Sequence, residues 1–78
     1  MLTRYIQEAM GKARYKLVED GSYFGEIPGL DGVWASERTL EKCRQILQEV
    51  LEDWLLLKLR ENDRIPKIGR IDLNTEAA

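Results

Sequence analysis

Hydrophobic and polar positions recur with two different periods along this chain. Residues 1–12 carry apolar side chains every three or four positions, which predicts a short helix that Thr3 caps and that Gly11 loosens at its end. Residues 13–18 then alternate apolar with polar side chains, which is the period of a β-strand with one covered face. The N-terminal quarter therefore predicts a helix followed by a strand.

Two further short strands are predicted, each set off by turn residues. Asp20-Gly21 is a strong hairpin signal and precedes a second strand at residues 23–27. Pro28-Gly29 and Asp31-Gly32 predict the next turn, because proline ends ladder pairing and glycine accepts positive φ. A third strand is expected at residues 33–35. The three strands form an antiparallel meander.

The second half of the chain predicts one long helix, from Leu40 to about Glu61. Thr39 is the expected N-cap, with Ser36 as the alternative. Apolar residues follow at Cys43, Ile46, Leu47, Val50, Leu51, Trp54, Leu55 and then Leu57 or Leu59, a stripe suited to packing on a sheet. A final edge strand is predicted at Lys67–Leu73. Because the end of the helix is apolar nearly all round, we expect a second subunit or partner to cover Trp54, Leu56, Leu57 and Leu59.

The predicted fold class is α+β: a short N-terminal helix, a three-stranded antiparallel meander, a long helix packed on the sheet and a final edge strand, with a β-β-β-α-β core. One domain is expected over residues 1–78, with its core at about 13–73, the N-terminal helix at 1–12 and a frayed tail at 74–78. A chain of 78 residues supports only a marginal core, so homo-oligomerisation is expected.

Composition argues against catalysis. The chain has no histidine, which removes histidine-based acid–base chemistry and most zinc sites. Cys43 falls on the apolar stripe and is expected to be a small buried hydrophobe. We predict no catalytic, cofactor-binding or metal-binding residue, and no enzyme. No secretory signal is visible and no membrane span is expected, which together with the lone cysteine favours the cytoplasm.

Negative charge is concentrated in the middle of the sequence. The net charge is -2, and residues 19–37 contain five acidic residues without a lysine or arginine between them. This block is either an ordinary solvated face or an acidic surface for a basic partner. The second interpretation gives these candidate partner-binding residues: Glu19, Asp20, Tyr23, Glu26, Asp31 and Trp34. Trp34 and Trp54 are most simply core residues, with interface anchors as the alternative.

The order of these motifs resembles the HicB-like antitoxin family. The resemblance lies in the aromatic strand followed by GEIPGLDGVWA, in the helix start at Thr39-Leu40-Glu41, and in LEDWLLLKLRENDRIPKIG. The family pattern is matched over about residues 13–73, at Tyr23, Glu26, Ile27, Pro28, Gly29, Gly32, Leu40, Trp54 and Ile65-Pro66.

This resemblance implies a partly degraded RNase H-like fold and an antitoxin role. Such antitoxins mask a small basic, mRNA-cleaving toxin of double-stranded-RNA-binding fold (HicA-like). The sequence lacks the C-terminal DNA-binding domain of many members, so no direct DNA binding is expected. Nuclease activity is not expected either, because residues 13–18 contain no acid to hold metal ions. The alternative function is a stand-alone homo-oligomeric structural or regulatory module without a toxin.

Overall fold

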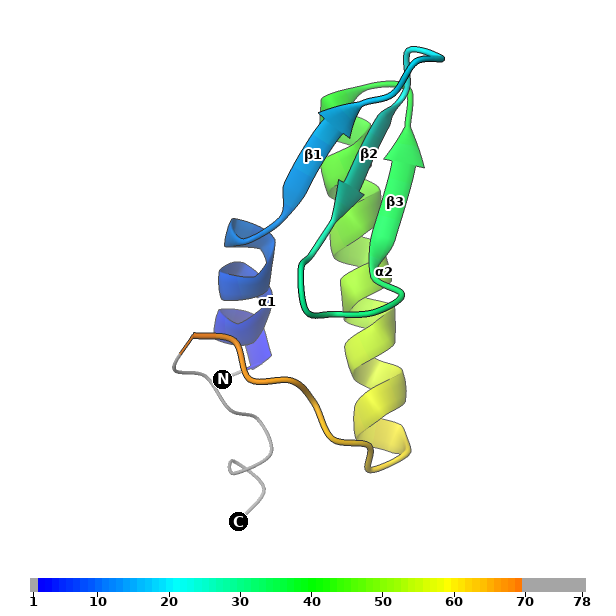
Figure 1. The fold of residues 1–78 in the computed structure, drawn as a ribbon. Helices are drawn as coiled ribbons and strands as arrows, with labels where there is room; N and C mark the ends of the chain where they lie inside the picture. Colours follow the sequence, from blue (N-terminus) through cyan, green and yellow to red (C-terminus); the bar gives the residue numbers. More distant parts are fainter. Residues whose placement is uncertain (1, 70–78) are drawn as a thin grey trace.

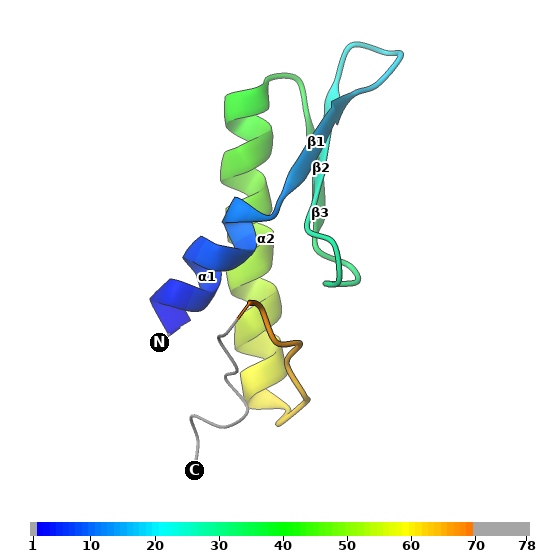
Figure 2. The same ribbon diagram turned by 60° about the vertical axis from the view of Figure 1, so that its left-hand side comes forward.

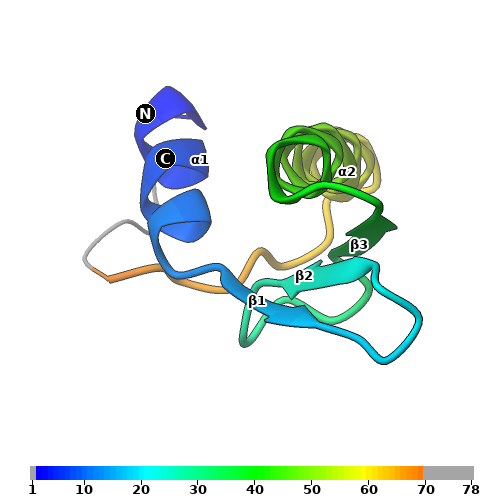
Figure 3. The same ribbon diagram turned by 90° about the horizontal axis from the view of Figure 1, so that it is seen from above.

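The described residues form one antiparallel sheet with helices on one side. The computed structural model describes residues 2–69. Its elements are α1 (Leu2–Gly11), β1 (Arg14–Leu17), β2 (Tyr23–Glu26), β3 (Trp34–Glu37) and α2 (Leu40–Arg60). The strands lie in the order β1-β2-β3, and both helices lie on the same side of the sheet (Figures 1 and 3). The predicted α+β architecture is thereby confirmed.

The register fixes which side chains face the helices. Tyr15 lies opposite Gly25, and Gly25 lies opposite Ala35. Since directly opposed residues share a face and alternate residues change face, these residues define the helix-facing side of the sheet. Arg14, Lys16, Phe24, Glu26, Trp34 and Ser36 occupy the other side, which we call the outer face. Neither helix covers the outer face (Figure 2).

Both ends of α2 are capped by local hydrogen bonds. The Lys42 amide donates to Thr39 Oγ1 at 3.1 Å, so Thr39 is the N-cap, as predicted. At the other end Asn62 adopts a positive φ of 57°, which ends the helix. The amide of Asn62 then donates to the Leu59 carbonyl and that of Asp63 to the Lys58 carbonyl, the two bonds of a Schellman motif. Here asparagine takes the position usually held by glycine.

One face of α2 supplies the centre of the core. Cys43, Leu47, Leu51 and Leu55 are buried at four-residue spacing. The remaining buried residues come from α1, the sheet, the β2–β3 loop and the segment after α2: Tyr5, Ala9, Ile27, Leu30, Val33, Ala35, Ile65 and Ile68. The sheet covers only the first half of α2. The β2–β3 loop, α1 and the segment after α2 enclose the rest.

Gly25, in the central strand, leaves room for the side chains of Tyr15 from β1 and Cys43 from α2. A Cβ atom at this position would lie 2.8 Å from Tyr15 Cδ1 and 3.1 Å from Cys43 Sγ. Two side chains, one from β1 and one from α2, therefore occupy the space that a side chain at this position would need. The Tyr15 hydroxyl is buried, with no hydrogen-bond partner among the described residues. Burial also raises the pKa of Tyr15.

The first helix and the last described segment are tied together. Tyr5 is fully buried, and its hydroxyl donates to the Pro66 carbonyl at 2.6 Å. After α2 the chain turns back toward α1 (Figure 1), so residues 61 positions apart meet at this bond. Burial raises the pKa of the Tyr5 phenol to about 12.

Three local predictions differ from the structure. Thr3 lies inside α1, which already includes Leu2, so it is not the cap. Val33 precedes β3 and is buried in the core, and β3 extends to Glu37 instead of ending at Ala35. Ile27 similarly follows β2 because its side chain turns into the core. The predicted strand at Lys67–Leu73 lies largely outside the described residues.

Replacing Gly25 with alanine is expected to destabilise the fold by about 1–3 kcal/mol, as overpacking of a close-packed interior does. The new methyl group would push on the Tyr15 ring and the Cys43 thiol. Chemical denaturation of the two proteins measures the difference. Gly11→Ala is the matched control, since nothing lies within 4 Å of its Cβ position. An equal loss in both variants would contradict the packing argument.

Tyr5 is expected to make the fold sensitive to alkali. The unfolded phenol loses its proton near pH 10, whereas the folded phenol keeps it to about pH 12. Above pH 10, deprotonation of the phenol therefore stabilises the unfolded state relative to the folded state. As a result, the free energy of unfolding falls as the pH rises toward 12. Denaturation of the wild type and of Tyr5→Phe between pH 9 and pH 12 tests this. Tyr5→Phe should show the shallower decline; identical slopes would refute the assignment.

Candidate interaction surface

The outer face of the sheet centres on a pair of aromatic rings. Phe24 and Trp34 stack with ring centroids 5.9 Å apart and an interplanar angle of 28°. Lys16 Nζ lies 5.8 Å from the Phe24 centroid, on the β1 side of the pair. Trp34 is 54% exposed. The structure therefore places Trp34 on an open surface and not in the core, which leaves the interface interpretation for this residue.

Charge is divided across the outer face. Glu26 lies directly opposite Trp34 on β2, and Asp31 is exposed in the adjoining β2–β3 loop. On β1, Arg14 lies directly opposite Glu26 and Lys16 lies directly opposite Phe24. Glu26, on the central strand, is therefore flanked by Arg14 on one side and by Trp34 on the other. We call Phe24, Glu26 and Trp34 the aromatic–acidic patch.

The acidic residues predicted as one surface occupy two ends of the sheet. Glu19 and Asp20 lie at the β1–β2 hairpin, whereas Glu26 and Asp31 lie at the opposite end, by the β2–β3 loop (Figure 1). Asp20 accepts hydrogen bonds from the Ser22 amide at 2.9 Å and the Ser22 hydroxyl at 2.6 Å. These bonds lower the pKa of Asp20 and commit its carboxylate to the turn.

Tyr23 and Phe24 face opposite sides of β2. Tyr23 is half-buried and packs against the core on the helix-facing side, so it is separated from Trp34 by the sheet. Phe24 is the aromatic residue that joins Trp34. The alternation along β2 indicates two opposed faces, but only the register with β3 identifies which aromatic shares a face with Trp34.

The apolar end of α2 does not present one face. Trp54 is half-buried, and Lys58 Nζ lies 5.5 Å from its ring centroid. Leu56, Leu57 and Leu59 are exposed. At about 100° per residue, Leu56 and Leu59 share one side of the helix and Leu57 lies on another. The four predicted interface residues are therefore distributed around α2.

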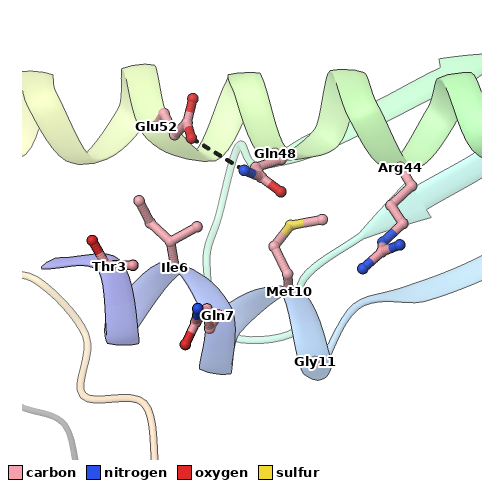
Figure 4. Close-up of a pocket in the computed structure, with 8 residues that line it drawn as sticks. All are labelled: Thr3, Ile6, Gln7, Met10, Gly11, Arg44, Gln48 and Glu52. Carbon is pink, nitrogen blue, oxygen red and sulfur yellow. Dashed lines mark hydrogen bonds between the residues drawn. The ribbon is translucent and has the colours of Figure 1, made fainter.

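A groove of about 510 Å³ separates α1 from α2 (Figure 4). Ile6 and Met10 line it from α1, and Arg44, Gln48 and Glu52 line it from α2. Gln48 donates to the Glu52 carboxylate at 3.2 Å across one helical turn.

Cys43 is buried, as predicted. Its thiol lies 3.6 Å from the carbonyls of Tyr23 and Ala35. Burial, with Glu37 as a smaller cause, raises the pKa of Cys43, which disfavours the thiolate. Within residues 2–69, no group of three or more histidine, cysteine or acidic residues could hold a metal ion. None of the helices in this part of the chain is long and apolar enough to cross a membrane.

The described residues thus form a small α+β protein with one uncovered sheet face, and the aromatic–acidic patch on that face is suited to binding. The chain belongs to the UPF0150-like family, whose pattern matches residues 4–66. This membership is consistent with a small antitoxin-like protein.

A solved relative supports the same fold. The chain is similar to the protein TTHA0281 from Thermus thermophilus, whose crystal structure matches it with 49% sequence identity and a TM-score of 0.86. The similarity covers 91% of this chain and 89% of the other. A comparison with curated proteins finds no match.

Trp34→Ala is expected to lower the free energy of unfolding by only about 0.5–1.5 kcal/mol. This is the range that the contact between two aromatic rings contributes in addition to the burial of their surface. Its ring rests on Phe24 and is more than half exposed, so little core is lost. Thermal or chemical denaturation measures the change, and Leu51→Ala serves as the contrast, at about 2–5 kcal/mol. A loss of that size in Trp34→Ala would mean that the ring is structural.

Proposed function

We propose that this protein is a non-catalytic, antitoxin-like binding protein that masks a small basic, RNA-cleaving toxin. The observation that carries the proposal is the aromatic–acidic patch. An exposed tryptophan beside a carboxylate offers an apolar anchor and a charge partner at one place. Membership of the UPF0150-like family supports an antitoxin-like role.

The proposed mechanism is occlusion. A nuclease that cleaves RNA binds phosphates with basic residues, and those residues are attracted by carboxylates at the same positions. Glu26, on the outer face, and Asp31, in the loop beside it, would supply that charge while Trp34 inserts between the basic side chains. Glu19 and Asp20 lie at the other end of the sheet and would contribute long-range attraction, with little direct contact.

Identification of the partner is the first test. A tagged copy at the native locus is purified, and a small basic companion that cleaves RNA in isolation is the expected result. The purified protein should then abolish that cleavage at equal molar ratio. A companion without RNA-cleaving activity, or cleavage unaffected by this protein, would reject the proposed function.

Charge reversal locates the contact. Glu26→Lys with Asp31→Lys is expected to weaken binding of the basic toxin by about 100-fold or more, because like charges replace two attractive pairs. The matched control is Glu19→Lys with Asp20→Lys, which makes the same change of charge at the far hairpin and should cost less. Binding is measured by calorimetry at two salt concentrations. A larger loss in the control pair would move the contact to the hairpin.

A further inference from the structure

The two edges of the sheet differ in how they are protected. β1 carries Arg14 and Lys16, and charged side chains on an edge strand oppose pairing with another strand. β3 carries neither lysine nor arginine, has no proline, and pairs with β2 in unbroken register over residues 34–37. Its one charged residue, Glu37, stands at the end of the strand, half-buried on the helix-facing side, so residues 34–36 have none of these devices that prevent strand addition.

Backbone groups on β3 alternate between β2 and the open edge. The Ile27 amide donates to the Val33 carbonyl at 3.4 Å, which makes residues 27 and 33 a hydrogen-bonded pair. In an antiparallel ladder such pairs recur every second residue, so residues 35 and 37 also bond to β2. Trp34 and Ser36 consequently direct their N–H and C=O groups away from the sheet.

We propose that the β3 edge binds β3 of a second copy of this chain, in an antiparallel pair centred on Ala35. A two-fold axis passes beside Ala35 and relates the two copies, so that Trp34 of each copy lies opposite Ser36 of the other. These are the residues whose backbone groups point outward, so the register joins donors to acceptors on both strands. The two alanines meet at the axis, where a small side chain permits close approach. The result is a continuous six-stranded sheet.

Charge complementarity supports this register. Arg38 follows β3 directly and Asp31 precedes it, and both are exposed. In the two-fold pair the end of β3 that is followed by Arg38 lies next to the β2–β3 loop of the second copy, which carries Asp31. The same contact occurs twice, which makes the edge complementary to itself.

Helix spacing is also compatible. α2 contacts both β2 and β3. At its first turn α2 lies between these strands, because Cys43 Sγ is 3.6 Å from the carbonyl oxygens of both Tyr23 and Ala35. With strands about 4.8 Å apart, the helix axis there lies about 5 Å from the two-fold axis. The two α2 helices are then about 10 Å apart, which is a normal packing distance. Cys43 contacts the Ala35 carbonyl, so the first two turns of the helices face each other. Ile46 lies on this flank, about 200° around α2 from Gln48, which lines the groove toward α1.

Proline substitution at the two edges tests the proposal directly. Ser36→Pro removes an outward amide of β3, and Leu17→Pro removes one from β1, where the register with β2 leaves Leu17 facing outward. Edge strands tolerate proline when its nitrogen faces away from the ladder. By light scattering, the wild type and Leu17→Pro are expected at twice 9.1 kDa and Ser36→Pro at 9.1 kDa. A folded Ser36→Pro protein that is still dimeric would overturn the proposal. A wild type that remains at 9.1 kDa up to about 1 mM would also overturn it, because even weak pairs associate at that concentration.

Amide exchange in the unmodified protein decides the matter if Ser36→Pro does not fold. In the dimer the amides of Trp34 and Ser36 should exchange at least about tenfold more slowly in concentrated than in dilute protein, because mass action protects them. The amides of Tyr15 and Leu17 should show no such change. Protection at β1 instead of β3, or no dependence on concentration, would reject the β3 interface.

A charge swap checks the register. Arg38→Glu and Asp31→Arg are each expected to weaken the dimer by about tenfold, and the double variant should recover it, since the opposite charges meet again across the axis. Failure of the double variant to recover dimerisation would exclude the pairing centred on Ala35. Dimerisation is measured without any toxin, so this result is independent of the proposed function.

Discussion

The buried stripe of α2 is the constraint on which the rest of the structure depends. Four side chains at four-residue spacing, from Cys43 to Leu55, must be shielded from water, and a sheet of three short strands shields only the first half. The lower half is enclosed by a loop, a second helix and the returning chain. Because these covering segments all lie on the helix side, no segment within residues 2–69 covers the other side of the sheet, and that side is available for recognition.

Local chemistry makes most of the fold predictable. The Thr39 cap, the turn glycines and the period of α2 each act within a few residues, and the structure confirms them. The ends of β2 and β3 are less predictable, since Ile27 and Val33 leave the strands to fill the core between α2 and the loop. That choice depends on contacts between distant segments, which no short window of sequence contains.

The candidate surface is predictable only in part. Residue type alone points to Trp34, Glu26 and Asp31, and they lie near one another. Residue type points equally to Tyr23, but this side chain faces the helices. Strand alternation alone does not say which face of a strand is covered, so the sequence could not exclude Tyr23. Phe24 is missing from the prediction for the same reason. Closeness in sequence groups Glu19 with Glu26, whereas a hairpin separates such neighbours by the length of a strand.

The bond between Tyr5 and Pro66 has a consequence for how the molecule opens. It joins α1 to the segment after α2, and both segments also place side chains in the core, among them Ala9 and Ile65. Because they share this bond and one core, we expect the two segments to open together and not one at a time. A binding partner that contacts either segment would thereby influence the order of the other.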